Sequence, residues 1–350
     1  MKPVVRAALL ALLAVDPAAA GPAPAQPAKS EAARTEPLLP APPAVRPSGP
    51  ATPDEVMAEA FGAFQRGYFV TALNLALPLA EAGLRAAQTL VGEIHAKGLG
   101  VRRDPALAGQ WYRRAAAQGD AGALLALGLM ALDPEDGTAD KKAAAGFLEQ
   151  AAAKGQAEAA FRLALLLLDG ESPTRNAPRA AALLRRAAEA GNAEAAYVLG
   201  QIYRAGDGVP VSESEAARWI GAAAQNGLTA AQVEYGILLF NGKGVAKDEA
   251  GAANWFRRAA LAGNPVGQNR LARMLAAGRG VPVDRVAAAK WHFLARAAGI
   301  SDPALDMILS GLGPAERDKA KAAAEAFAAP LTGEAAPVGV AAAGQPTPSP

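Results

Sequence analysis

A glycine recurs every 36 residues through most of this 350-residue chain. Seven glycines keep this interval without a gap, at Gly83, Gly119, Gly155, Gly191, Gly227, Gly263 and Gly299. A fixed period of this length indicates an internal structural repeat. Repeat arrays grow by stacking one unit on the next, and they usually bind other molecules rather than transform them.

The residues between two of these glycines predict two helices joined by a turn. In residues 228–263, apolar side chains recur at helical spacing from about Thr229 to Phe240. Gly242 and Gly244 end that helix, because glycine tolerates the positive φ of a helix end and a tight turn. A second helix then runs to the next glycine of the series. We name the two helices of each repeat helix A and helix B.

Further columns of residues repeat at the same interval and fit this helix pair. Helix B is expected to follow a residue with a preferred N-cap side chain, namely Asp104, Asp140, Asn176, Ser212, Asp248 and Asp284. Helix B then carries a large residue at Trp111, Phe147, Leu183, Trp219, Trp255 and Trp291. Helix A carries a small residue that allows close packing, at Gly92, Gly128, Ala164, Gly200, Gly236 and Ala272. Ser212 and Glu215 also predict a full capping box.

The combined pattern resembles the Sel1-like repeat family, whose members are related to the tetratricopeptide repeats. The matching motifs stand at Gly92–Val101, Gly200–Val209 and Gly236–Val245, with partner motifs at Trp111–Gly119, Trp219–Gly227 and Trp255–Gly263. The resemblance covers residues 84–299 as six repeats and implies an all-α fold, a right-handed α/α solenoid. Residues 53–83 are expected to form a divergent helix pair at the N-terminal end, and residues 300–329 to form capping helices.

Two neighbouring repeats carry a different turn between their helices. The turn at residues 134–137 reads Pro-Glu-Asp-Gly, and the turn at residues 170–173 reads Gly-Glu-Ser-Pro. Drift in a tolerant exposed loop explains both changes, and we favour it over the alternative that the two turns mark a binding edge.

The two ends of the chain are expected to lie outside the solenoid. Residues 1–20 read as a secretory signal peptide, because Lys2 and Arg6 precede a short apolar run and Ala18 to Ala20 offer a cleavage site. Residues 21–52 are rich in proline and alanine and predict a disordered linker, and residues 330–350 predict a disordered tail. We therefore expect an exported, periplasmic protein.

Composition and motifs argue against catalysis. The chain has no cysteine, which excludes disulfides, thiolate nucleophiles and cysteine-bound metals. Its net charge of +2 is too small for a nucleic-acid-binding protein, and the Arg pairs 113–114, 185–186 and 257–258 are interpreted as a solvated face of helix B. Of the two histidines, His95 is expected to pack in or near the core and His292 to lack a second ligand nearby. We expect no enzyme activity, cofactor, metal, nucleic acid or small-molecule substrate, and at most a peripheral contact with a membrane.

The functional information is then expected in residues that break the repeat. In solenoids of this kind helix A tends to line the concave side, so polar or aromatic side chains expected to be exposed on helix A are the candidates for binding a partner. They are Arg162, Tyr197, Gln201, Arg204, Glu234, Asn269, Arg270 and Arg273. Tyr197 could equally pack between repeats.

The favoured function is a non-catalytic scaffold or regulator that binds a protein partner in the periplasm. The terminal segments and the last repeat resemble those of periplasmic alphaproteobacterial members, and that group includes a regulator of exopolysaccharide production that holds a membrane sensor kinase inactive. A sensor kinase or another envelope protein is therefore the expected kind of partner. The alternatives are a cell-wall or glycan-associated protein or β-lactamase-like hydrolase, and a cytosolic adaptor if no signal peptide is cleaved.

Overall fold

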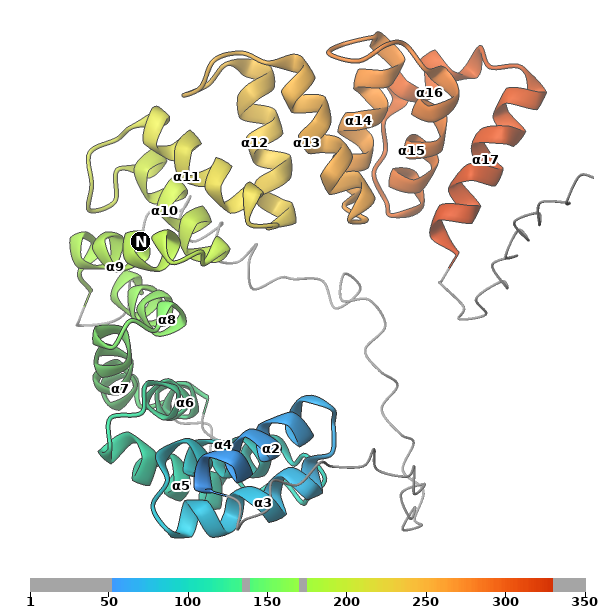
Figure 1. Cartoon of the computed structure of the whole chain (residues 1–350). Helices are drawn as coiled ribbons and strands as arrows, with labels where there is room; N and C mark the ends of the chain where they lie inside the picture. Colours follow the sequence, from blue (N-terminus) through green and yellow to red (C-terminus); the bar gives the residue numbers. More distant parts are fainter. Residues whose placement is uncertain (1–51, 134–138, 170–174, 330–350) are drawn as a thin grey trace, which may run out of the picture. The chain divides into compact units, whose positions relative to one another are not determined.

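The computed structural model describes residues 52–133, 139–169 and 175–329. The predicted signal peptide, nearly all of the predicted linker, the predicted tail and both variant turns lie outside these ranges. All regular secondary structure in the described ranges is α-helical, and helices adjacent in the chain pack in pairs (Figure 1). The prediction of an all-α solenoid built from helix pairs is confirmed.

The chain divides into two compact units at Lys247 and Asp248. The first unit contains α2 (Pro53–Gln65), α3 (Phe69–Glu81), α4 (Arg85–Lys97), α5 (Pro105–Ala117), α6 (Ala121–Leu132), α7 (Lys141–Ala153), α8 (Ala157–Leu168), α9 (Ala177–Glu189), α10 (Ala193–Ala205), α11 (Glu213–Gln225) and α12 (Thr229–Asn241). In this unit α2 pairs with α3, and each even-numbered helix from α4 to α10 is a helix A that pairs with the helix B after it.

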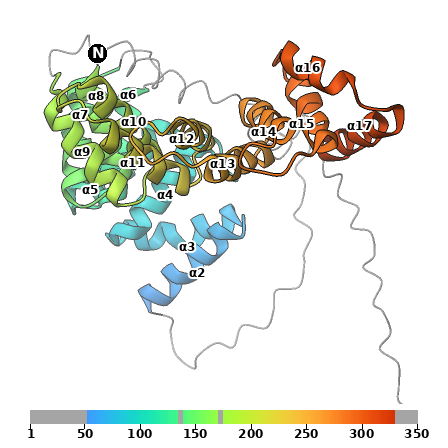
Figure 2. The same ribbon diagram turned by 90° about the horizontal axis from the view of Figure 1, so that it is seen from above.

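The second unit contains α13 (Glu249–Leu261), α14 (Pro265–Ala277), α15 (Arg285–Ala297), α16 (Pro303–Ser310) and α17 (Pro314–Ala328). Figure 2 shows α15 between α14 and α17, and α15 packs against both. The short helix α16 contacts α14 and α15.

The two sequence signals that define the helix ends are confirmed. All six predicted N-cap residues precede a helix B, and each side chain accepts a hydrogen bond from a backbone N–H three residues on. The seven glycines of the series all have positive φ, from 78° at Gly119 to 97° at Gly83. A side chain with a Cβ is strained in that conformation, so glycine is required where the chain leaves helix B.

The predicted capping box at Ser212 and Glu215 is wrong. Ser212 Oγ accepts from the backbone N–H of Glu215 at 3.2 Å, but the reciprocal bond is absent. The Glu215 carboxylate instead accepts from Trp219 Nε1 at 3.2 Å and pairs with Arg218. The indole N–H lies one turn along the same helix face and competes for the carboxylate that the capping box needs.

Helix A and helix B are held together by the residue that follows the large residue of helix B. This column is buried throughout, at Tyr112, Leu148, Leu184, Ile220, Phe256 and His292. A Cβ added to Gly200 of α10 would lie 2.7 Å from Ile220 Cγ1 and 3.1 Å from the carbonyl oxygen of Ala216. The small residue of helix A therefore accommodates this column, and not the tryptophan column before it.

Buried glutamines join helix A to the helix before it. Gln88 Nε2 donates to the Ala80 carbonyl at 3.1 Å, and Gln268 Nε2 donates to the Ala260 carbonyl at 3.4 Å. Gln232 makes the equivalent bond within the first unit. Each glutamine adds a second donor to a carbonyl near the end of a helix, because the same carbonyl already accepts from the backbone N–H of the glycine that follows the helix.

Candidate functional site

The expectation that the eight candidate residues are exposed holds for Arg270 and Arg273, and the other six are half-buried or buried. Tyr197, Gln201 and Asn269 are 8%, 3% and 8% exposed. Gln201 and Asn269 bond to residues about one repeat further along the chain, at Glu234 and Asp302. Sequence periodicity places a residue on a helix face, but the side chain that it meets in the next repeat decides whether it is covered.

Four of the candidates meet in one polar cluster between α10 and α12. Gln201 Nε2 donates to Glu234 Oε2 at 2.8 Å, and Arg204 Nη1 donates to Glu234 Oε1. Arg204 Nη1 also donates to Gln201 Oε1 at 3.2 Å. The side chains of Arg204 and Glu234 are mostly covered, at 24% and 19% exposed. Charge-assisted hydrogen bonds of this kind hold the Glu234 carboxylate in one orientation.

Tyr197 completes this cluster on the α10 side. Burial raises the pKa of the Tyr197 phenol, and the neighbouring negative charge of Glu234 together with its hydrogen bond raises that pKa further. The phenol is therefore uncharged at every physiological pH.

A pocket of about 420 Å³ lies beside this cluster. Its lining residues come from α10, α12 and the turn after α12, and they are Tyr197, Arg204, Ala230, Val233, Glu234, Ile237, Leu238 and Lys243. The α12 residues recur at helical spacing and form one stripe along the helix. Binding sites commonly combine a mostly apolar lining with a few placed polar groups, and this pocket has that composition.

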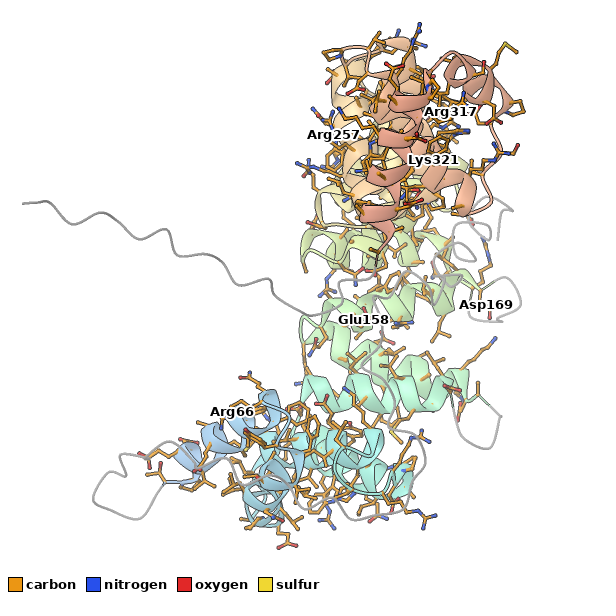
Figure 3. The ribbon with its side chains drawn as sticks, turned by 90° about the vertical axis from the view of Figure 1, so that its right-hand side faces the viewer. Arg66, Glu158, Asp169, Arg257, Arg317 and Lys321 are labelled. Carbon is orange, nitrogen blue, oxygen red and sulfur yellow. The ribbon has the colours of Figure 1, made fainter. Side chains whose placement is uncertain are left out.

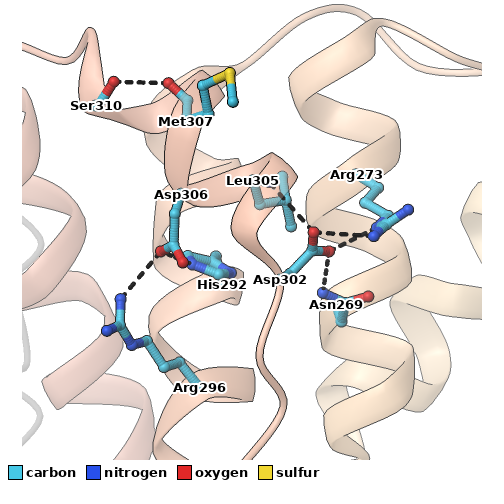
Figure 4. Close-up of polar contacts among 9 residues, drawn as sticks. All are labelled: Asn269, Arg273, His292, Arg296, Asp302, Leu305, Asp306, Met307 and Ser310. Atoms are coloured by element: carbon cyan, nitrogen blue, oxygen red, sulfur yellow. Dashed lines mark hydrogen bonds and ion pairs between the residues drawn. The ribbon is translucent and has the colours of Figure 1, made fainter.

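Two other candidates, Asn269 and Arg273, meet at Asp302, which immediately precedes α16 (Figure 4). Asn269 Nδ2 donates to Asp302 Oδ2 at 2.7 Å, and Arg273 donates through Nε and Nη2 at 2.6 and 2.9 Å. Burial opposes ionisation of Asp302, but these bonds and the Leu305 N–H outweigh it and lower its pKa to about 2. Asp302 is 2% exposed, so this cluster fixes α16 to α14 and offers little surface to a partner.

The two remaining candidates, Arg162 and Arg270, do not join either cluster. Arg162 Nε pairs with Glu158 Oε1 at 2.5 Å on α8, where Figure 3 labels Glu158. Glu158 also accepts from Asn192 Nδ2 at 3.1 Å. Arg270 is exposed on α14.

His292, for which no second ligand was expected nearby, lies against one carboxylate, that of Asp306. His292 is 1% exposed, and its Nε2 lies 2.8 Å from Asp306 Oδ1, which also accepts from Arg296 (Figure 4). The hydrogen bond from His292 lowers the pKa of Asp306, with a smaller contribution from Arg296. The sequence signal for the burial of His292 was its position, because it is the last member of the buried column that begins at Tyr112. His95 is half-buried on α4.

The arginines of helix B cover the tryptophan column. Arg114 lies 4.5 Å from the Trp111 ring centroid, and Arg258 lies 4.6 Å from that of Trp255. Arg257, labelled in Figure 3, is exposed. The predicted solvated face of helix B describes these residues, and Arg114 and Arg258 place their guanidinium groups over the indole rings.

A family model of the Sel1 repeat matches residues 85–120, 121–156, 157–192, 193–228, 229–264 and 265–300. The chain belongs to the Sel1 repeat family. Each matched segment begins within one residue of the start of a helix A and ends just beyond a helix B. The α10–α12 pocket therefore lies between the helix A of the fourth Sel1 repeat and the helix A of the fifth.

One solved structure supports the same assignment. A Sel1 repeat protein from Oxalobacter formigenes matches with a TM-score of 0.62 and 30% identity, over 75% of this chain and 77% of that protein. A protective antigen of uropathogenic Escherichia coli strains, which displays an SLR fold, matches with a TM-score of 0.46 and 25% identity, over 79% of this chain and 68% of that protein. No curated protein matches the chain.

Sel1 repeat proteins are generally non-catalytic scaffolds for interactions with other proteins. Among the residues that the structure describes, no three His, Cys, Asp or Glu side chains come together in a group that could hold a metal ion. No helix in the described ranges is long and apolar enough to cross a membrane.

Proposed function

We propose that this Sel1 repeat protein is an exported, non-catalytic regulator that binds a protein partner in the periplasm. Its partner is an envelope protein such as a membrane sensor kinase, and the binding surface centres on the α10–α12 pocket. The signal-like residues 1–20 support the location, and the Sel1 repeats support the binding role.

The observation that carries this proposal is the convergence of Tyr197, Gln201, Arg204 and Glu234 beside a mostly apolar pocket. These residues differ in type from those at the same positions of the other repeats, so the fold that the repeats share does not require them. Their mutual bonds also hold the rim of the pocket in a fixed arrangement before a partner arrives, which lowers the entropy lost on binding.

Photo-crosslinking in cells that express the protein tests the proposal. A photo-reactive amino acid replaces Glu194, which is exposed on α10 one turn before Tyr197, or replaces the exposed helix B residue Arg257 as a control. We expect an adduct with an envelope protein from position 194 and none from position 257. Equal adducts from both positions, or none from position 194, would contradict the proposed surface.

The location is tested by sequencing the N-terminus of the protein purified from its native cells. We expect mature chains that begin near residue 21, in the periplasmic fraction. An intact Met1 in the cytosolic fraction would instead support the cytosolic adaptor.

A further inference from the structure

The pocket between α10 and α12 is lined mostly by apolar side chains. Val233, Ile237 and Leu238 line it from α12, and the ring of Tyr197 lines it from α10. A volume of about 420 Å³ is large enough for a bulky side chain of a bound polypeptide. Removing such a side chain from water is the main source of affinity at a site of this kind.

The one carboxylate that lines the pocket already accepts hydrogen bonds from neighbouring side chains. Glu234 accepts from Gln201 with one oxygen and from Arg204 with the other, and Tyr197 is bonded beside it. Glu234 is therefore not placed to attract a basic group of a ligand, because its charge is balanced within the cluster.

The polar capacity that remains at the pocket consists of donors. Arg204 Nε is buried and has no acceptor among the described residues, so a ligand oxygen that entered beside it would relieve an unsatisfied N–H. Lys243 is 56% exposed and pairs with Glu213 at 3.2 Å, which leaves further ammonium N–H groups directed to solvent. A ligand that fits these donors must supply acceptors next to its apolar group.

We propose that the pocket binds a segment of the partner protein in which a large apolar residue stands next to an aspartate or glutamate. The apolar side chain fills the space over Ile237, and the carboxylate binds Lys243 and approaches Arg204. This inference rests on the proposed function, since it names the chemistry of the partner at the same surface.

Neighbouring repeats supply matched control positions. Val266 holds the place of Ala230 one repeat later, and Arg279 holds the place of Lys243. Arg279 even makes the equivalent ion pair, with Glu249 in place of Glu213. Neither control residue lines the pocket. Each pocket residue, Ala230 or Lys243, therefore has a control residue at the equivalent position of the next repeat that does not line the pocket.

The test is a selection of short random peptides, displayed on phage, against the purified full chain and the variants Ala230→Phe and Val266→Phe. We expect the full chain and Val266→Phe to enrich peptides with an acidic residue beside a large apolar one. Ala230→Phe fills the pocket and should enrich none of these. Enrichment that persists in Ala230→Phe, or selected peptides that are basic or lack an apolar residue, would overturn the proposal.

A labelled peptide from that selection then separates the two contacts by fluorescence polarisation. Replacing its apolar residue by alanine should weaken binding by about tenfold or more. Lys243→Gln should remove the preference for the acidic peptide over its glutamine form, whereas Arg279→Gln should keep it. The same affinity for both peptide forms in the unmodified chain would refute the carboxylate contact. If position 194 crosslinks to an envelope protein while the selection fails, the proposed function stands and this inference falls.

Discussion

At the scale of single residues, the small column of helix A sets how closely the two helices of a repeat approach. We expect Gly200→Ala to destabilise the chain by roughly 1–3 kcal/mol, because its new Cβ would meet Ile220 and the backbone oxygen of Ala216. Gly146→Ala is the matched control, since Gly146 lies in α7 with nothing within 4 Å of an added Cβ. That change should stabilise the chain by about 1 kcal/mol or less, through helix propensity alone. Urea unfolding measures both, and equal effects would contradict the close contact.

The tryptophan column makes a second prediction at this scale. Trp219 is 5% exposed, and its indole N–H binds Glu215. Trp219→Ala should therefore cost about 3–5 kcal/mol in the free energy of unfolding. Arg218→Ala removes the guanidinium that lies over the same ring and should cost about 0.5–1 kcal/mol, as expected for an exposed cation–π contact. A loss at Trp219 no larger than that at Arg218 would show that the ring is not a packing element.

What the sequence predicted well at this scale depends on contacts within a few residues. The six N-caps bond to a backbone N–H three residues away, so composition and spacing were enough to find them. The capping box failed because Trp219 offers Glu215 a competing donor. The burial of Gln201 and Asn269 was missed because Glu234 and Asp302, their partners, lie 33 residues further along the chain.

At the scale of elements, α16 is attached to α14 by the Asp302 carboxylate. The folded-state pKa of Asp302, about 2, lies below the ordinary value of 3.8, so ionisation of this group stabilises the fold. That contribution is complete above about pH 4 and is lost as the pH falls toward 2. The shift is worth roughly 2 kcal/mol.

Asp302→Asn tests this attachment. The variant should be less stable than the unmodified chain near pH 7, and the difference should shrink when urea unfolding is repeated at about pH 2.5. Asp318→Asn, at an exposed position of α17, is the control and should change stability by less than about 0.5 kcal/mol at both pH values. A difference that does not depend on pH would mean that the charge of Asp302 does not hold α16.

The helices after the last repeat show what pattern could and could not reveal about elements. The capping helices predicted over residues 300–329 are α16 and α17, which begin at local start signals, a proline at N1 after Asp302 and after Gly313. The attachment of α16 to α14 could not be predicted from the sequence, because Asn269 and Arg273 precede α15 in the chain and their partner Asp302 follows it.

At the scale of the whole molecule, the 36-residue period predicted the helix pairs, and the resemblance of the repeated motifs to Sel1-like repeats implied the family. The period could not reveal the α10–α12 pocket, because two of the residues that line it, Arg204 and Glu234, belong to different repeats and meet through their side chains. The same period also gave no reason to expect turnover of a substrate.

We expect the purified chain to hydrolyse a chromogenic β-lactam no faster than buffer does. Turnover that is lost in Ala230→Phe would support the hydrolase alternative instead.

The central claim is that the surface of α10 and α12 binds a protein partner. Hydrogen–deuterium exchange of the full chain, with and without the envelope protein captured from position 194, measures this most directly. We expect the partner to slow exchange in α10, α12 and the turn that carries Lys243. This protection should disappear in Ala230→Phe and persist in Val266→Phe. Protection confined to other helices, or protection that survives in Ala230→Phe, would contradict the central claim.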